Sequence, residues 1–372
     1  MCSLKQFMGN PSKAITQTPL YVAIQGAAKN ATLAACTREG VIHALIAVGP
    51  LGIRVNADFN HALFSAFSEL SHALGYGSIC ELARNTESLC VAMSGVFQEC
   101  DEFAVRQTLE SIKFQSSQHT VICEDVWAAL AAEETDTGAV ILACTGSNVF
   151  IRNKESHYIT VGGWGSELAD LGGGFHVGKL AIARVFDYVD RRHRVSAAFV
   201  EAILSFLELQ TPTQLVPWYH EVRRTSFWRS QIADLAIVVT KLAERDADST
   251  AKAIISSASS ELVNSMQAGL KRAAVEGILR EADPFPVILS GGLGLASLTY
   301  RNRITQGLIS LVTGKSPSGD SWPSWSFSLA KHHPIAGALA FALSGTRNFP
   351  SQTTLRRILT DPHMMEFQQK KS

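Results

Sequence analysis

Short apolar runs separated by turn residues open the patterned part of the sequence. Apolar residues dominate positions 21–25, 32–37 and 41–48, and the stretches between them contain glycine with charged or amide residues. Runs of this length joined by tight turns are typical of neighbouring antiparallel strands. We therefore predict a three-stranded antiparallel meander over residues 21–48.

Helices and strands then alternate. Between residues 58 and 74, apolar side chains recur every three or four positions, as they do on the buried face of an amphipathic helix. A second helix is predicted over 102–112, and short apolar runs predict strands over 89–93 and 120–123. The first part of the chain is thus predicted to have the order βββαβαβ.

The same order starts again at residue 138. Its predicted elements are strands over 138–145, 149–152 and 158–161, a helix from about 174, a mostly helical stretch over 195–280, strands over 286–290 and 325–329, and a helix over 334–343. A single long repeat differs from the short periods of solenoid proteins. We therefore predict an α/β protein with two similar domains that flank a ligand cleft, a common place for a binding site.

The domain boundaries follow from this repeat. The predicted parts are a flexible tail over residues 1–18, a first domain over 19–136, a second domain over 137–335 with a helical insertion, a helix at about 336–350 that packs back on the first domain, and a polar tail over 351–372. A stretch rich in Ser, Gly, Pro and Trp, residues 313–324, is predicted to be a surface loop.

Charge and cysteine content narrow the function classes. The 372 residues include 33 Lys and Arg and 33 Asp and Glu, so the overall charge favours neither nucleic acid nor an anionic membrane as a partner. None of the seven cysteines forms a CxxC pair, which favours free thiols in a reducing compartment. The first 18 residues lack the apolar core of a signal peptide, and no apolar run is long enough for a membrane span. We expect a cytoplasmic protein with no membrane partner.

Glycine-rich motifs come directly after several predicted strands. They read A-M-S-G at 92–95, C-E-D-V-W-A-A-L at 123–130, A-C-T-G-S-N at 143–148, G-G-W-G-S-E-L-A-D-L-G-G-G-F at 162–175, S-G-G-L at 290–293 and P-I-A-G-A at 334–338. In order and spacing, over about residues 20–345, they resemble the motifs of the N-acetylglucosamine kinase and BadF-type ATPase family. The block at 162–175 is the most specific of them.

This resemblance implies a fold and an activity. The family has two duplicated ribonuclease-H-like domains of the actin-like ATPase type. The resemblance therefore implies a carbohydrate kinase that uses ATP and Mg²⁺ to phosphorylate N-acetylglucosamine or a related amino sugar. Family members often form dimers, so it also suggests a homodimer.

The resemblance also implies roles for individual residues. Asp125 would be the catalytic residue, because a carboxylate there could accept the proton of the attacking sugar hydroxyl. The residues implied to bind the sugar are Asn56, Ser147, Asn148, Gly163, Trp164, Gly165 and Asp170. The residues implied to bind the nucleotide are Gly26, Lys29, Thr145, Gly146, Gly291 and Gly292.

Four of these residues have a structural alternative. Asp125 and Asn56 each precede or begin a predicted helix, where a short polar side chain often serves as the N-cap. Asp170 comes just before glycines, as an aspartate in a turn would. Trp164 could pack in the core or form a wall of the sugar site. The sequence leaves these alternatives open.

The first phosphate loop departs from the family pattern. Gln25 replaces the aspartate that organises Mg²⁺, Ala27 and Ala28 replace two glycines, and Lys29 replaces a hydroxyl residue. An amide is a poorer ligand for Mg²⁺ than a carboxylate, so the implied metal is in question. We expect weak or altered phosphoryl transfer, with Lys29 supplying positive charge in place of the metal contact.

Three hypotheses about function follow. The first is the sugar kinase. Two smaller departures from the family motifs are Cys144 in place of a glycine and Leu171 in place of a glutamate. Taken together, the motifs that face the sugar match the family better than those that face the phosphates. The second is a catalytically weak or inactive relative that binds a sugar or regulates. The third is a BadF-type ATPase that acts on a partner enzyme, although Cys123 and Cys144 show no cluster-binding pattern.

Overall fold

The computed structural model describes residues 7–8, 18–96, 98–114, 119–279, 285–312 and 325–371. The chain divides into two compact units, one formed by Met1–Asp136 with Lys331–Ser372 and the other by Thr137–Ala330. Lys331 and the helix after it therefore lie in the first unit, although the second domain was predicted to extend to residue 335. Among the described helices, none has both the length and the apolar character that a membrane span requires.

The first unit is built on a six-stranded mixed sheet in the order β1-β4-β3-β2-β5-β6. Its strands are β1 (Phe7–Met8), β2 (Leu20–Gly26), β3 (Ala31–Cys36), β4 (Ile42–Val48), β5 (Thr86–Met93) and β6 (His119–Cys123). Strands β2, β3 and β4 form the predicted antiparallel meander, and β5 and β6 run parallel to β2. Every residue of β3 is buried, because helices cover both faces of the sheet.

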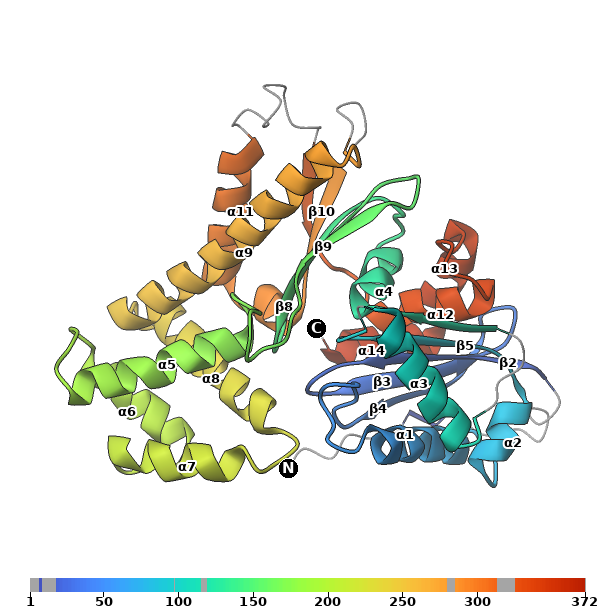
Figure 1. Cartoon of the computed structure of the whole chain (residues 1–372), viewed down its shortest axis with the longest axis horizontal. Helices are drawn as coiled ribbons and strands as arrows, with labels where there is room; N and C mark the ends of the chain where they lie inside the picture. The colour runs from blue at the N-terminus through green and yellow to red at the C-terminus, as the bar shows by residue number, and fades with distance from the viewer. Residues whose placement is uncertain are drawn as a thin grey trace. The chain divides into compact units, whose positions relative to one another are not determined.

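Two layers of helices enclose this sheet (Figure 1). The helices packed on one face are α1 (Phe59–Ala73), α2 (Ile79–Arg84) and α3 (Glu99–Ser111). The helices packed on the other face are α4 (Asp125–Ala132), α12 (Pro334–Ser344), α13 (Gln352–Leu359) and α14 (Pro362–Lys371). The predictions of α1 and α3 are confirmed, whereas α2 was not predicted.

The prediction of a polar tail over residues 351–372 is wrong. Helices α13 and α14 occupy this stretch and bury Leu355, Ile358, Met364 and Phe367 in the core of the first unit. Helix α13 buries three apolar residues and α14 two, and such short stripes are easily missed in a polar stretch. The flexible tail predicted over residues 1–18 lies outside the described residues, apart from β1 and Thr18, and so does the loop predicted at 313–324.

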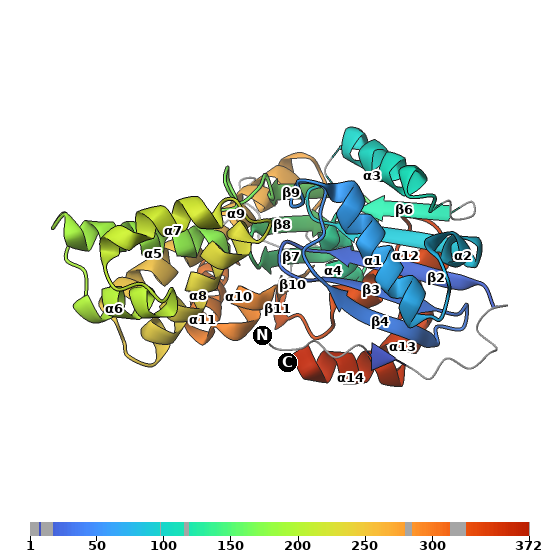
Figure 2. The same ribbon diagram turned by 90° about the horizontal axis from the view of Figure 1, so that it is seen from below.

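The second unit repeats the topology of the first. Its five strands follow the order β11-β10-β7-β8-β9 (Figure 2), which matches the order β6-β5-β2-β3-β4 of the first sheet. They are β7 (Gly138–Ala143), β8 (Ser147–Arg152), β9 (Tyr158–Gly162), β10 (Phe285–Ser290) and β11 (Trp325–Leu329). Strands β7, β8 and β9 form an antiparallel meander, and β10 and β11 run parallel to β7. The predicted duplicated α/β fold is confirmed.

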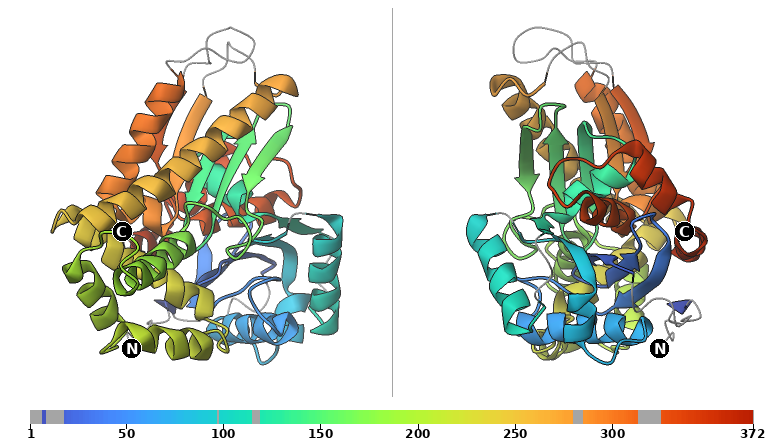
Figure 3. Two further views of the ribbon diagram at one scale, coloured as in Figure 1. Left: turned by 60° about the vertical axis from the view of Figure 1, so that its left-hand side comes forward. Right: turned by 90° about the vertical axis from the view of Figure 1, so that its right-hand side faces the viewer.

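Helices of the second unit form its core together with the sheet. They are α5 (Gly174–Val189), α6 (Ala197–Phe206), a short 3₁₀ helix (Pro212–Gln214), α7 (Leu215–Val222), α8 (Trp228–Glu244), α9 (Ser249–Val275), α10 (Gly292–Ala296) and α11 (Leu298–Val312). The long helix α9 crosses β8 and β9 (Figure 3). Helices α5, α8 and α11 pack around it, so the predicted helical insertion belongs to this core.

In both units the parallel strands end at one edge of the sheet. In the first unit, β2, β5 and β6 lead into Gly26, Ser94 and Asp125 at this edge. In the second, β7 and β10 lead into Thr145 and Gly291. Loops at the carboxyl ends of parallel strands are the usual ligand sites of open α/β sheets. The glycine-rich motifs therefore lie where the fold favours binding.

Glycine lets α12 approach α4 closely. A Cβ atom on Gly337 would lie 2.1 Å from the carbonyl oxygen of Ala128. We expect Gly337→Ala to lower the free energy of unfolding by about 1–3 kcal/mol in urea denaturation, because α4 would have to move away. In Gly49→Ala, where a Cβ would meet nothing within 4 Å, the change should stay within about 0.5 kcal/mol. Equal stability of the two variants would contradict this packing.

Candidate functional site

Asp125 is the first residue of α4 and is buried at the carboxyl end of β6. The N-cap position belongs to Glu124, whose side chain makes no capping hydrogen bond. The structural alternative for Asp125, a helix N-cap, is therefore wrong. A carboxylate in the first turn of a helix is stabilised as an anion by the helix dipole, and an anionic carboxylate can accept a proton.

The first phosphate loop follows β2 and retains one glycine for a steric reason. A Cβ on Gly26 would lie 2.7 Å from the carbonyl oxygen of Leu51 and 2.8 Å from Cγ of Met93. Gln25 is buried beside it, and its Nε2 donates a hydrogen bond to the Gly26 carbonyl oxygen at 3.2 Å. Lys29 is exposed at the turn. The loop thus offers a neutral amide and an exposed cation.

Asn56 organises the loop that precedes α1. Its Oδ1 accepts a hydrogen bond from the Gly52 backbone N–H at 2.9 Å, and its Nδ2 donates to the Pro50 carbonyl oxygen at 3.0 Å. The N-cap of α1 is Asp58, which accepts from the His61 N–H at 2.9 Å. The N-cap alternative for Asn56 is therefore wrong, and its amide shapes a loop of the first unit.

In the second unit, Asp170 joins the turn after β7 to the glycine-rich block at 162–175. Its Oδ1 accepts a hydrogen bond from the Gly165 N–H at 2.8 Å. A Cβ on Gly146 would lie 2.2 Å from Asp170 Oδ2, so the carboxylate rests directly against this glycine. The same turn is hydrogen bonded to the start of α5. The Thr145 carbonyl oxygen accepts from the Phe175 N–H at 2.9 Å, and the Cys144 carbonyl oxygen accepts from the Gly174 N–H at 2.7 Å.

Asp170 is a buried carboxyl group, and its burial disfavours the ionised form. Burial raises the pKa of Asp170, and hydrogen bonds from the Gly165 and Ser147 backbones partly oppose this. A raised pKa in the folded state means that stability is lost as the pH rises through that pKa and the group ionises. Buried carboxyl groups with a shifted pKa gather at functional sites, so Asp170 is a candidate functional residue.

Ser147 and Asn148 begin β8 beside Asp170. The Ser147 hydroxyl donates to the Leu171 carbonyl oxygen at 2.7 Å, and its own carbonyl accepts from the Gly163 N–H at 3.0 Å. Asn148 is buried, and within the described part of the chain its Oδ1 has no hydrogen-bond partner. Buried polar atoms are nearly always paired in proteins, so the unpaired oxygen marks Asn148 as a candidate for contact with a ligand.

Glycines at positive φ surround the exposed Trp164. Gly163 has φ +75° and Gly165 has φ +111°, values that residues with a side chain rarely adopt. The Trp164 side chain is 62% exposed, so it is not a core residue.

The two glycines after β10 differ in their surroundings. A Cβ on Gly291 would lie 2.4 Å from the Ala143 carbonyl oxygen, whereas one on Gly292 would meet nothing within 4 Å. Gly291 thus packs against β7, and Gly292 faces open space.

The structure therefore brings together, within the second unit, some of the residues that were predicted to bind the sugar. Ser147, Gly163, Gly165 and Asp170 are linked by backbone and side-chain hydrogen bonds. Asn56 and Asp125 belong to the first unit. Two residues of the second unit were missed by the sequence analysis, His176 and Tyr300, which both hydrogen bond to Gly172. No motif or periodicity distinguishes either of them.

The described residues offer few side chains that could bind a metal ion. The described residues contain no group of three or more His, Cys, Asp or Glu side chains that could hold an ion. At the end of β2 the side chain is the Gln25 amide, whose Nε2 is used within the loop. This donor set does not fit a dedicated Mg²⁺ site, for which carboxylates are preferred.

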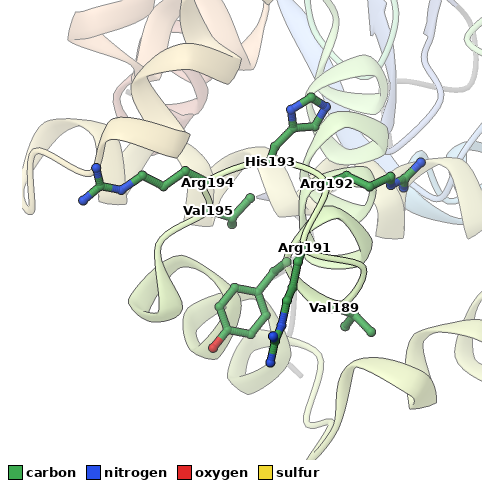
Figure 4. Close-up of a pocket in the computed structure, with 7 residues that line it drawn as sticks. Val189, Arg191, Arg192, His193, Arg194 and Val195 are labelled. Atoms are coloured by element: carbon green, nitrogen blue, oxygen red, sulfur yellow. The ribbon is translucent and has the colours of Figure 1, made fainter.

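A cavity of about 610 Å³ lies at the opposite end of α5. Its lining includes Arg191, Arg192, His193 and Arg194, whose side chains point in different directions (Figure 4). Arg192 pairs with Asp187 at 3.1 Å. The 16 residues of α5 separate this cavity from Gly174 by about 24 Å, so it is not part of the site around Asp170.

Comparison with curated proteins gives two kinases of amino sugars. The chain is 27% identical over 195 residues to the N-acetylmuramic acid/N-acetylglucosamine kinase of Clostridium acetobutylicum, a match that covers 52% of this chain and 61% of that protein. It is 23% identical over 207 residues to the N-acetyl-D-glucosamine kinase of Dictyostelium discoideum, covering 55% and 62%. The match thus spans about three fifths of the length of these relatives. No family model matches the chain.

Comparison with solved structures identifies the fold. A candidate N-acetylglucosamine kinase from Chromobacterium violaceum aligns with a TM-score of 0.62 and 18% identity, over 88% of this chain and 99% of that one. A ROK family glucokinase from Streptomyces griseus, solved with glucose and AMPPNP, aligns with a TM-score of 0.50 and 15% identity over the same shares. The chain therefore has the two-domain actin-like fold of these sugar kinases, and its resemblance to N-acetylglucosamine kinases is confirmed.

Proposed function

We propose that the protein is an ATP-dependent kinase that phosphorylates N-acetylglucosamine or a related amino sugar. The observation that carries this proposal is the buried Asp170 carboxyl group, which joins the turn at Gly146 to the block at 162–175. The motif order and the names of the two curated relatives point to the same substrates.

Asp125 is proposed as the general base. It would accept the proton of a sugar hydroxyl while that oxygen attacks the γ-phosphorus of ATP. One P–O bond forms to the sugar, the bond between the γ-phosphorus and the bridging oxygen breaks, and ADP leaves with the electron pair. The position of Asp125 in the first turn of α4 favours the ionised carboxylate in this role, because the helix dipole stabilises an anion there.

The sugar is proposed to bind to the block of the second unit. Asn148 Oδ1, buried and without a partner among the described residues, would accept a hydrogen bond from a sugar hydroxyl or from the acetamido N–H. Ser147, Asp170 and the backbone around Gly163 and Gly165 would supply further polar contacts, and Asn56 would contribute from the first unit. The exposed ring of Trp164 would cover an apolar face of the sugar.

The nucleotide is proposed to bind at the glycine turns. Thr145 and Gly146 in the second unit and Gly26 with Lys29 in the first would contact its phosphates, and Gly291 and Gly292 would allow the adenosine to approach the backbone. Because the donors at Gln25 do not suit Mg²⁺, we assign the ion no protein ligand and expect it to arrive on ATP.

Gln25 favours a second candidate, a relative that binds sugar but transfers phosphate weakly or not at all. The third hypothesis, a BadF-type ATPase, has less support, because Cys123 is buried in the first unit and no metal-binding group occurs among the described residues. Buried free thiols at Cys90 and Cys123, on neighbouring strands, fit the reducing cytoplasm that we propose as the location.

ADP release with Mg-ATP tests the proposal. The panel contains N-acetylglucosamine, N-acetylmannosamine, glucosamine, N-acetylmuramic acid and glucose. We expect release that depends on an N-acetylated amino sugar. Binding of such a sugar without any turnover would favour the non-catalytic relative, and ATP hydrolysis that no sugar stimulates would favour the ATPase.

Gln25→Asp is expected to increase turnover. A carboxylate at this position could hold Mg²⁺ directly or through water, and changes near a metal alter its affinity about 10- to 100-fold. We expect kcat to rise about tenfold and the Mg²⁺ concentration for half-maximal activity to fall. Gln25→Glu, with its carboxylate one methylene further out, serves as the matched control. Unchanged Mg²⁺ dependence in Gln25→Asp would show that this loop does not meet the metal.

A further inference from the structure

Gly172 is held at both of its backbone polar groups by side chains from two helices. Its N–H donates to Nδ1 of His176 on α5 at 3.0 Å, and its carbonyl oxygen accepts from the Tyr300 hydroxyl on α11 at 2.6 Å. The two side chains are 124 positions apart in the sequence (300 − 176). Helix α9 packs against both α5 and α11.

The backbone conformation and the close packing at position 172 require glycine. Its φ of +93° is rare for residues with a side chain. A Cβ would also lie 2.8 Å from the Ala258 carbonyl oxygen and 2.8 Å from Leu262 Cγ, both on α9. Three helices therefore define where this backbone lies.

The position of Gly172 determines the position of the predicted sugar-binding groups. The preceding carbonyl, that of Leu171, accepts the Ser147 hydroxyl at 2.7 Å. One residue earlier, the Asp170 carboxylate accepts from Gly165 and rests on Gly146. A shift of Gly172 would thus be transmitted to Ser147 and Asp170 through two peptide units.

We propose that Tyr300 and His176 are positioning residues that hold Gly172 so that Asp170 and Ser147 meet the sugar. This inference rests on the proposed function, because it takes Asp170 and Ser147 as sugar ligands. Neither positioning residue touches the sugar or ATP. They act by fixing the backbone conformation of the block.

The two hydrogen bonds require defined protonation states. Tyr300 must be protonated to donate, and complete burial raises its pKa, so it remains a donor. His176 must be neutral at Nδ1 to accept. Burial lowers the pKa of His176 below the ordinary value of 6.5, Lys179 on the same helix lowers it too, and Glu261 on α9 raises it.

The hydrogen bond to His176 makes both the stability of the protein and its affinity for the sugar depend on pH. Since the folded pKa lies below 6.5, the unfolded chain takes up the proton first as the pH falls. The stability contributed by neutral His176 is therefore complete above pH 6.5 and is lost as the pH falls below it. Affinity for the sugar should fall as the pH passes through this lowered folded pKa, because protonated Nδ1 no longer accepts from Gly172.

Four proteins test the inference: the wild type, Tyr300→Phe, His176→Leu and His176→Asn. Phenylalanine keeps the buried ring and removes only the donor, and asparagine keeps an acceptor near the place of Nδ1 that does not titrate. The measurements are calorimetric binding of N-acetylglucosamine from pH 5 to 8, KM for ATP, and amide hydrogen exchange of the segment 163–175.

We expect Tyr300→Phe and His176→Leu to weaken sugar binding about five- to tenfold, to speed exchange in 163–175 and to leave KM for ATP unchanged. His176→Asn should restore binding and remove its acidic decline. If the wild type binds the sugar and both bond-removing variants bind it equally well, the inference is wrong while the proposed function stands. If the wild type binds no sugar of the panel, the proposed function fails and the inference fails with it.

Discussion

Asp125→Asn is expected to lower sugar-dependent ADP release about 10²- to 10⁴-fold, because asparagine cannot accept the proton of the attacking hydroxyl. Asparagine has nearly the same shape, so α4 should still begin at this residue and the KM values for sugar and ATP should change little. The measurement is kcat at saturating ATP and N-acetylglucosamine.

Asp58→Asn is the matched control for this variant. Asp58 is also an aspartate at the start of a helix, but it is exposed, and it caps α1 through a hydrogen bond from the His61 N–H. Asparagine caps helices about as well as aspartate, so activity should not change. A kcat for Asp125→Asn above one tenth of the wild-type value, on the order of a single lost hydrogen bond, would exclude Asp125 as the base.

Gly146→Ala is expected to have the second largest effect. The new Cβ would lie 2.2 Å from Asp170 Oδ2, so the carboxylate must leave its place and the hydrogen bond from Gly165 is lost. We expect KM for the sugar to rise at least about tenfold and the free energy of unfolding to fall by about 1–3 kcal/mol.

Steady-state kinetics and urea denaturation measure the two effects of Gly146→Ala. Gly49→Ala adds the same methyl group where nothing lies within 4 Å, so both quantities should remain at the wild-type values. If Gly146→Ala keeps the wild-type KM for the sugar, the position of Asp170 does not matter for binding and the proposed site is in another place.

The duplicated fold could be predicted from the sequence because its signals are local. Apolar runs between tight turns predicted both antiparallel meanders, and the repeat of their order predicted two similar units. Helix α2 was missed because six residues are too few to show a helical period. Helices α13 and α14 were missed because each buries only a few side chains within a polar stretch.

The N-cap alternatives show the limit of sequence patterns at helix ends. Glu124 and Asp125 are adjacent acidic residues, and the sequence could not tell which of them begins α4. Patterns place a helix end only to within one or two residues. The roles of Asp58 and Asn56 required the hydrogen bonds of the structure for the same reason.

The candidate site was predicted by resemblance rather than by geometry. The motifs named Asp170 and Gly146 separately, and only the structure shows the carboxylate resting on the glycine. Tyr300 could not be found, because it contacts Gly172 from 128 residues away and its helix carries no motif. Long-range hydrogen bonds of this kind leave no periodic signal in a sequence.

Transfer of the labelled γ-phosphate from ATP to N-acetylglucosamine is the measurement that decides whether the protein is an amino-sugar kinase. The wild-type protein is incubated with Mg²⁺, γ-labelled ATP and the sugar, and the label is separated into sugar phosphate, inorganic phosphate and unreacted ATP. We expect label in the sugar phosphate, at a rate that Asp125→Asn lowers about 10²- to 10⁴-fold. Bound sugar with no transferred label, or label found only in inorganic phosphate, would contradict this expectation.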